Sequence, residues 1–438
     1  MRKIRETRAP VERALLVGVG PKSQTDLIRS SLDELKRLTD TAGAIVVGEA
    51  TQALARFNPG TLIGSGKVSE IAGMTAGLRA GTVIFDVELS PGQQKNLEKE
   101  LPKRKIVDRT RLILDIFAQR ARTAEGRLQV ELAQLSYMLP RLTGAWREFS
   151  QQAGGIGTRG PGERKLEYEK RHIQLRIKHL RHDLDRVRDA RRLRRERRAG
   201  VPVPQVALVG YTNVGKSTLL NHLTGEKAVY ADDKLFATLD PTARRVRLPE
   251  GGWAVATDTV GFIQRLPTTL IAAFRATLEE VVDADLILHV RDVSNPDHKA
   301  QAQDVVGVLT DLGVPPEKPI IEIWNKIDQL PRNDTGSPVF VVAAEPVSKT
   351  VAVVETSAVT GEGLDKLRDA IENALGQEAR TYHVHVPFTA GADVGWLYNH
   401  AEIIGDAQPD DTGTTYEVRV DPRFKSVFNE RFAGRIAE

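Results

Sequence analysis

The feature that most constrains the fold of this chain is a glycine-rich loop between a predicted strand and a predicted helix. The apolar run Val206–Val209 leads directly into Gly210-Tyr211-Thr212-Asn213-Val214-Gly215-Lys216-Ser217, and the residues from Thr218 to Leu223 have helical spacing. A G-x-x-x-x-G-K-[ST] sequence in this strand–loop–helix context is typical of a phosphate-binding loop, the P-loop. It predicts a central α/β domain with a mostly parallel sheet.

The residue types in this loop suit phosphate chemistry. Backbone N–H groups can surround phosphate oxygens, and the N-terminus of the following helix adds a favourable dipole. We expect Lys216 to reach the β- and γ-phosphates and to act in catalysis, and the Ser217 hydroxyl to bind Mg²⁺. Residues 210–218 are therefore predicted to contact the nucleotide.

A second segment, Asp258-Thr259-Val260-Gly261, follows the next predicted strand, Trp253–Thr257. An aspartate at the end of a strand can hold Mg²⁺ through water, and a glycine N–H can sense the γ-phosphate. We therefore expect the segment to contact the nucleotide, with Asp258 at the metal and Gly261 in catalysis.

A third segment predicts which base is bound. In Asn325-Lys326-Ile327-Asp328, Asp328 can accept hydrogen bonds from the N1–H and amino group of guanine, whereas adenine offers no such donor pair. Asn325 is expected to tie this loop to the purine, and the stem of Lys326 to cover its face. The backbone of Ser357-Ala358, after a further predicted strand, is expected to contact the base oxygen. The order of these segments is typical of the translation-factor class of P-loop GTPases and predicts GTP and GDP as ligands.

A switch threonine that closes on Mg²⁺ is expected between the P-loop and Asp258. The stretch Phe236-Ala237-Thr238-Leu239-Asp240-Pro241-Thr242 lies there, and Thr238 and Thr242 both qualify by position. Residues 236–240 are thus expected to approach the nucleotide and the metal.

Phe262 follows Gly261, where many small GTPases have a glutamine that orients the attacking water. An apolar side chain cannot polarise water, so we expect slow hydrolysis that a partner or an ion accelerates. Asn213 is a candidate ligand for a monovalent cation such as K⁺; alternatively, it only stabilises the loop.

The remaining sequence predicts three further regions around the central domain, which spans residues 201–376. Residues 1–110 alternate short apolar runs with helical spacing, as in a small α/β domain. Residues 377–438 predict a small α+β domain, with a helix between Val394 and Ile404.

Residues 111–200 predict a long antiparallel coiled-coil hairpin. Heptad seams run from Leu128 to Leu142 and from Leu166 to Val187, and the glycine-rich stretch 154–162 separates them. Pro140 is expected to kink or weaken the last turn of the first helix.

Composition limits the compartment and the chemistry. The 438 residues include no cysteine, which excludes disulfides and thiolate metal sites. No run approaches the roughly 18 apolar residues of a membrane span, and the N-terminus lacks the apolar core of a signal peptide. We expect a cytoplasmic protein, and nothing in the sequence requires more than a monomer.

Basic residues concentrate in the predicted hairpin. Arg159, Arg164 and Lys165 lie at the glycine-rich stretch, and eight arginines lie between residues 186 and 198. This excess predicts salt-dependent binding to phosphates of structured RNA. The alternative is a solvated helix surface with i,i+4 ion pairs.

Together these motifs resemble the HflX GTPases over roughly residues 10–375. The resemblance is carried by the segments Ile63–Val68, Arg122–Leu135, Gly154–Glu163, Gly210–Ser217 and Phe236–Thr242. It implies a factor that binds the large ribosomal subunit, with the N-terminal domain and hairpin touching ribosomal RNA, and GTP hydrolysis that ribosomes stimulate. Some family members split stalled ribosomes under stress.

The resemblance also bears on three details. It aligns the switch threonine with Thr238, and it is broken at Arg164-Lys165, where the family more often has Thr-Gln. Gly64-Ser65-Gly66-Lys67 is only a partial phosphate loop, which we interpret as a structural turn; the alternative is a second nucleotide contact in the N-terminal domain. Two other functions stay open: a GTP-switched RNA-binding module without splitting activity, and a membrane-associated regulator with a peripheral basic patch.

Overall fold

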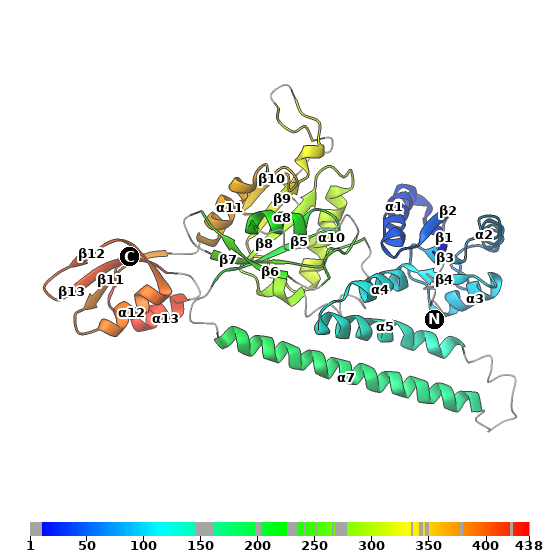
Figure 1. The fold of residues 1–438 in the computed structure, drawn as a ribbon, viewed down its shortest axis with the longest axis horizontal. Helices are drawn as coiled ribbons and strands as arrows, with labels where there is room; N and C mark the ends of the chain where they lie inside the picture. The colour runs from blue at the N-terminus through cyan, green and yellow to red at the C-terminus, as the bar shows by residue number, and fades with distance from the viewer. Residues whose placement is uncertain are drawn as a thin grey trace, which may run out of the picture. The chain divides into compact units, whose positions relative to one another are not determined.

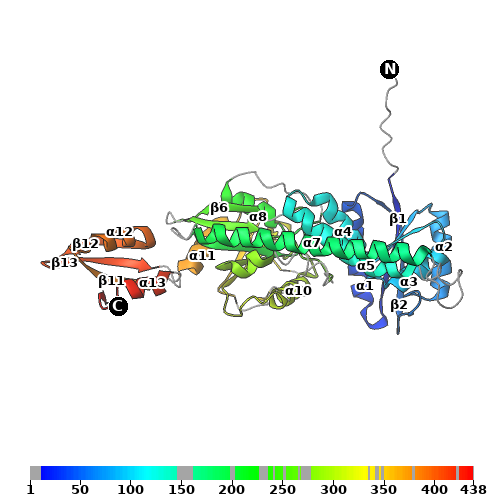
Figure 2. The ribbon, with the colours of Figure 1, turned by 90° about the horizontal axis from the view of Figure 1, so that it is seen from below.

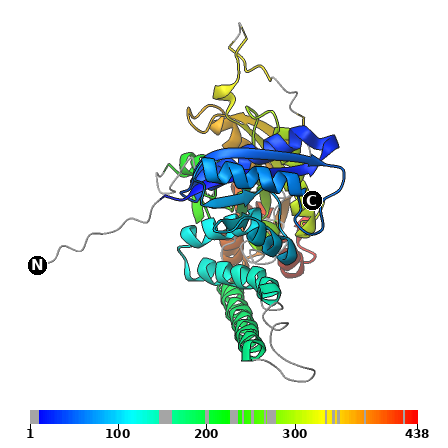
Figure 3. The ribbon, with the colours of Figure 1, turned by 90° about the vertical axis from the view of Figure 1, so that its right-hand side faces the viewer.

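The computed structural model describes most of the chain, and Figure 1, Figure 2 and Figure 3 show it from three directions. The described residues are 11–145, 161–197, 203–225, 235–239, 242–249, 253–264, 267, 278–333, 336–340, 345–346, 350–376, 380–420 and 424–437. They fall into two compact units. Unit one holds described residues up to 186 together with 235–239 and 263–267, and unit two holds the others.

Unit one contains a parallel sheet of order β2-β1-β3-β4, as the alternation of strands and helices predicts. The strands are β1 (Arg13–Pro21), β2 (Ile45–Leu54), β3 (Thr82–Phe85) and β4 (Lys105–Asp108). The helices are α1 (Thr25–Thr41), α2 (Ser65–Gly77), α3 (Pro91–Glu100) and α4 (Arg109–Arg120). The core is built on the central strands, whose side chains at Leu15, Val17, Val83 and Phe85 are buried.

The partial phosphate loop Gly64–Lys67, interpreted as a structural turn, leads into a helix. Gly64 is the N-cap of α2, and Ser65 begins the helix. Gly64 N–H donates to the side-chain oxygen of Gln52 on β2 at 3.0 Å. The segment therefore begins helix α2 and is hydrogen-bonded to β2 of the same domain.

Two longer helices follow, α5 (Ala124–Ala145) and α7 (Pro161–Arg197), cyan and green in Figure 3. Pro140 lies inside α5, which continues to Ala145 rather than ending at the proline. Arg176 on α7 donates through two nitrogens to Glu131 on α5, at 2.7 and 2.8 Å. α7 begins at Pro161, so the last two residues of the glycine-rich stretch are helical. Residues 154–160, including Arg159, lie outside the described residues.

Unit two contains a sheet of order β10-β9-β8-β5-β7-β6, parallel except for β6, which runs antiparallel to β7 (Figure 1). The strands are β5 (Gln205–Gly210), β6 (Thr242–Arg247), β7 (Trp253–Asp258), β8 (Leu286–Asp292), β9 (Ile320–Asn325) and β10 (Ala352–Thr356). Its helices include α8 (Lys216–Thr224), α10 (His298–Asp311) and α11 (Leu364–Gly376). The mostly parallel sheet predicted from the P-loop is thus confirmed, and the predicted residues at 210–218, 258–261, 325–328 and 357–358 lie at or just after the ends of β5, β7, β9 and β10.

A smaller antiparallel sheet of order β12-β13-β11-β14 follows in the same unit. Its strands are β11 (Arg380–Pro387), β12 (Ala401–Pro409), β13 (Gly413–Val420) and β14 (Ile436–Ala437), with helices α12 (Gly391–His400) and α13 (Lys425–Arg431). The helix expected up to Ile404 ends at His400, and β12 begins at the next residue. Buried Phe428 and Phe432 pack with Tyr382 and Val418 in its core. None of the described helices is long and apolar enough to span a membrane.

Candidate nucleotide site

The P-loop forms a tight turn between β5 and α8. Gly210, Asn213 and Gly215 all have positive φ angles, of 152°, 60° and 99°. A Cβ atom at Gly215 would overlap the side-chain amide of Asn325, so glycine is required there by both conformation and space. Asn213 is exposed and adopts a left-handed conformation that asparagine tolerates better than most residues, which accounts for its place in the loop.

Lys216 is buried within this loop. Its ammonium donates to the carbonyl oxygens of Gly210 at 3.1 Å and Tyr211 at 2.8 Å. Burial lowers the pKa of Lys216 from 10.5 to about 8, and the nearby Asp258 carboxylate partly opposes that shift. A buried cation surrounded by backbone groups at a helix N-terminus is suited to binding phosphate oxygens.

The predicted metal ligands Ser217 and Asp258 meet at the ends of neighbouring strands. Leu208 on β5 is paired with Asp258 on β7, so the P-loop and this carboxylate emerge at the same edge of the sheet. The Ser217 hydroxyl donates to Asp258 Oδ2 at 2.6 Å. A hydroxyl and a carboxylate are hard oxygen donors of the kind Mg²⁺ prefers when phosphates supply further ligands, so these residues fit Mg²⁺.

The segment after Asp258 is paired with the P-loop through its backbone. Phe262 N–H donates to Gly210 O at 3.1 Å, and Thr212 N–H donates to Phe262 O at 2.7 Å. A Cβ atom at Gly261 would lie 2.9 Å from Thr212 Cα and 3.1 Å from Lys216 Nζ, so a side chain there would displace the loop. The Phe262 side chain is 2% exposed and packs in the core.

The predicted switch residues around Thr238 belong to unit one. The Phe236 ring packs edge-on against Phe117 of α4 with centroids 4.6 Å apart, and Leu235 N–H donates to the Thr41 hydroxyl at 3.3 Å. Ala237, Thr238 and Leu239 follow in the same unit, whereas Asp240 lies outside the described residues. The structure brings Ser217 and Asp258 together within unit two, and closure of Thr238 on the metal stays a prediction.

The predicted guanine-binding residues form one network. Asn325 is 1% exposed, and its Nδ2 donates to Val214 O of the P-loop at 2.7 Å. Its Oδ1 accepts hydrogen bonds from Ala358 N–H at 2.9 Å and from the Thr356 hydroxyl at 3.2 Å. The Asn325 amide therefore joins its own loop to the P-loop and to the loop after β10. The sequence predicted only its contact with the purine.

Asp328 is held in the same network. The Ser357 hydroxyl donates to Asp328 Oδ1 at 2.6 Å, which leaves the other carboxylate oxygen available to guanine donors. Lys326, with a φ of 69°, places its ammonium 2.7 Å from Asp292 Oδ2, and Ile327 is buried.

Sequence reasoning missed Thr356 and Asp292. Asp292 directly follows the apolar run of β8, as Asp258 follows that of β7, and this position at a strand end is the signal that could have identified it. Thr356 carried no signal, because a threonine within a predicted strand is common.

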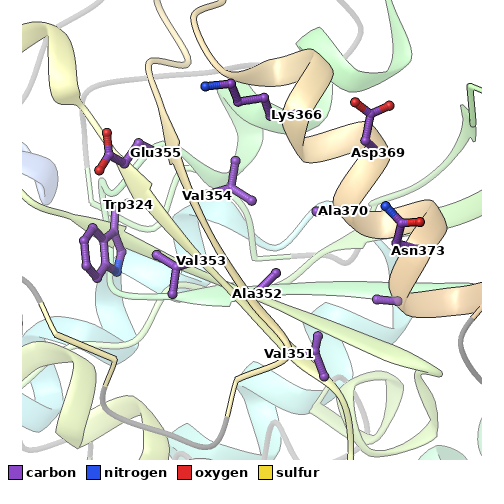
Figure 4. A pocket seen from close by; sticks show the side chains of 11 residues that line it. Trp324, Val351, Ala352, Val353, Val354, Glu355, Lys366, Asp369, Ala370 and Asn373 are labelled. Atoms are coloured by element: carbon purple, nitrogen blue, oxygen red, sulfur yellow. The ribbon is translucent and has the colours of Figure 1, made fainter. Parts of the chain in front are cut away.

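A wide groove of about 920 Å³ lies elsewhere in unit two, between β10 and α11 (Figure 4). Val351 and Val353 border it on the strand side, and Lys366 and Asp369 border it on the helix side. It contains none of the predicted nucleotide residues, so it is not the candidate site.

Four family models match the chain. Residues 29–118 match the N-terminal region of a GTP-binding GTPase, residues 120–198 match its middle region, residues 205–326 match a 50S ribosome-binding GTPase, and residues 342–435 match the HflX C-terminal domain.

Curated relatives match over most of their length. A GTPase HflX from Caldanaerobacter subterraneus subsp. tengcongensis is 46% identical over 90% of this chain and 87% of its own. GTPase HflX of Escherichia coli K12 is 40% identical over 93% of each chain. A GTP-binding protein from Sulfolobus solfataricus, solved with GDP, is 23% identical with a TM-score of 0.43, over 83% of this chain and 98% of its own. Because relatives named GTPase HflX match at 40–46% identity over most of both chains, this chain belongs to the HflX family of GTPases.

Proposed function

We propose that this GTPase binds the large ribosomal subunit and splits or rescues stalled ribosomes under stress, acting as a monomer in the cytoplasm. The observation that carries the proposal is the charge of α7, which has fourteen Lys and Arg residues against seven Asp and Glu residues. Polyphosphate surfaces such as ribosomal RNA attract an excess of this kind. The match of residues 205–326 to a 50S ribosome-binding GTPase supports the same partner.

In this proposal α5 and α7 form an antiparallel coiled-coil hairpin that carries its basic end to RNA. The Arg176–Glu131 ion pair supports their pairing, as do buried Ile177, Leu180 and Leu184 on the apolar side of α7. Arg159, Arg164 and Lys165 are the proposed RNA contacts at the end of this hairpin. Some arginines of α7 are already paired within the protein, as Arg188 is with Glu279.

In this proposal, GTP binding and hydrolysis control when the protein binds and leaves the ribosome. Ser217 and Asp258, together with the predicted switch residue Thr238, would hold Mg²⁺, which would supply positive charge to the phosphates, and Lys216 and the Gly261 N–H would contact the phosphates. The Phe262 side chain has no polar atom and is packed in the core, so it cannot orient the attacking water. Hydrolysis is therefore slow in isolation, and the ribosome supplies the missing positioning. K⁺ beside Asn213 stays a prediction.

Sedimentation with purified subunits tests the partner. The protein with a non-hydrolysable GTP analogue is expected to pellet with large subunits and to convert intact ribosomes into subunits on a sucrose gradient. The Lys216→Ala variant, which cannot hold the phosphates, is the nucleotide control. If the protein stays off the large subunit and ribosomes do not raise its GTP turnover, the proposal fails. Binding without dissociation of intact ribosomes favours an RNA-binding GTPase, and binding to anionic vesicles instead favours a membrane-associated regulator.

A triple substitution of Arg159, Arg164 and Lys165 by Ala tests the RNA contact. It is expected to weaken binding to large subunits and to flatten the dependence of log affinity on log salt, because each lost phosphate contact lowers that slope by about one. The matched control removes three exposed basic residues elsewhere: Lys36, Lys366 and Arg419. Equal salt slopes for both triple variants would refute the assigned contact.

A further inference from the structure

The loop after β8 meets the guanine-binding loop at the edge of the sheet. β8 and β9 are parallel neighbours, and their last residues, Asp292 and Asn325, are paired in register. Val293 N–H donates to Asn325 O at 3.1 Å. The two loops therefore leave the sheet side by side, and Asp292 lies next to the segment predicted to recognise the base.

Asp292 is fixed on both of its oxygens. Oδ1 accepts hydrogen bonds from Ser294 N–H at 3.1 Å and from the Ser294 hydroxyl at 2.5 Å. Oδ2 lies 2.7 Å from Lys326 Nζ. The Asp292 side chain is 14% exposed and that of Lys326 is 20% exposed, so the pair is largely shielded from water and from salt.

The ion pair with Asp292 restricts a side chain that is otherwise flexible. The backbone of Lys326 is left-handed, with a φ of 69°. Its four-carbon stem has many rotamers when the ammonium is solvated. An ammonium held at Asp292 restricts those rotamers before any ligand arrives. The stem can then present a fixed apolar surface in the loop that contains Asn325 and Asp328.

We propose that Asp292 is a positioning residue of the guanine site. It acts through Lys326: the Asp292 carboxylate holds the ammonium, and the ordered lysine stem forms one wall of the base subsite. Since the base is common to GTP and GDP, Asp292 contributes equally to the binding of both. This inference rests on the GTPase activity and not on the proposed ribosomal role.

The test is a double-mutant cycle on nucleotide affinity, with Asp292→Asn, Lys326→Met and the double variant. Each single variant is expected to weaken binding of fluorescent GDP and of a GTP analogue by the same factor, about tenfold for a shielded charged hydrogen bond. In the Lys326→Met background, Asp292→Asn is expected to have no further effect. In steady-state hydrolysis, the KM of Asp292→Asn rises with kcat unchanged, because only uniform binding is lost.

The control Glu402→Gln removes the carboxylate of an exposed ion pair with Arg419 in the C-terminal sheet, and it is expected to bind GDP normally. Additive losses in the cycle would show that Asp292 acts independently of Lys326 and would overturn the proposal. Unchanged GDP affinity in Asp292→Asn would overturn it as well. If Asp292→Asn unfolds at a lower temperature than the wild type, its weaker binding could reflect misfolding, and the affinity of Lys326→Met becomes the test. Unchanged GDP affinity in Lys326→Met would show that the Lys326 stem does not line the base subsite, and the proposal would fail.

Discussion

Removal of the Asn325 side chain should disconnect three loops at once. In the native protein its amide donates to Val214 O and accepts from Ala358 N–H and the Thr356 hydroxyl. All four residues are buried, so water cannot readily replace these bonds in Asn325→Ala. With a net contribution of about 1 kcal/mol for each hydrogen bond, the change should cost roughly 3 kcal/mol.

This loss should appear in nucleotide affinity, because the P-loop and the base-binding loops must be ordered together in the bound state. A cost of roughly 3 kcal/mol sets an upper limit of about 100-fold on the loss of GDP affinity, and the remainder appears as lower stability of the nucleotide-free protein. A titration with fluorescent GDP measures the affinity, and urea denaturation of the nucleotide-free protein measures any loss of global stability. Asn325→Asp, although nearly the same size, should also weaken GDP binding strongly, since a carboxylate oxygen would replace the donor to Val214 O and place two acceptors against each other.

The control is Asn333→Ala, which removes an exposed side chain that accepts one hydrogen bond from Ser337 N–H at 2.8 Å. It should bind GDP as the wild type does. If Asn325→Ala binds GDP within threefold of the wild type and unfolds at the same urea concentration, the assignment of Asn325 as the link between these loops is refuted.

Three further substitutions test the phosphate end of the site. Lys216→Met should abolish GTP binding and remove the pH dependence that Lys216 gives to the stability of the nucleotide-free protein, since burial lowers its pKa from 10.5 to about 8. Between pH 8 and 10.5 the unfolded wild type binds more protons than the folded one, so the unfolding free energy of the wild type should rise there and that of the variant should not; parallel pH profiles of the two proteins would contradict the cause given. Gly261→Ala should weaken binding of both GDP and a GTP analogue, because its Cβ would displace the P-loop at Thr212, with the larger loss for the GTP analogue; unchanged affinity for both in parallel titrations would contradict this placement of residue 261. Phe262→Gln should not raise the hydrolysis rate without ribosomes, because this side chain packs in the core; a tenfold increase in kcat would show that residue 262 can reach the water.

The parts of the site that the sequence predicted are those encoded by local pattern. The P-loop could be read from consecutive residues because its conformation depends on glycines and on one strand and one helix. Ser217 and Asp258 were each predicted as Mg²⁺ ligands from their own motifs, and the pairing of β5 with β7, which brings them together, is known only from the structure. The hydrogen bond from Asn325 to Val214 joins residues far apart in the chain, and no local pattern encodes such a contact.

Other parts of the fold were not predicted, or were predicted wrongly, for physical reasons. β4 was not predicted, because Lys105–Asp108 is too short a run for period-two alternation to be distinguished from helical spacing. Ile403 and Ile404 continue the apolar spacing of α12, but they lie in β12, where pairing with β13 overrides local spacing. Pro140 lies inside α5, which continues to Ala145, and the kink or weakened last turn expected there stays a prediction.

The central claim, that this GTPase works on the large ribosomal subunit, is tested most directly by steady-state GTP hydrolysis with purified subunits. The account predicts a low rate for the protein alone, a rise of tenfold or more with large subunits that saturates with their concentration, and no comparable rise with small subunits. The stimulated rate should fall as salt increases, because the proposal assigns the contact to basic residues of the α5–α7 hairpin. A rate that is the same with and without large subunits at low salt would contradict the account.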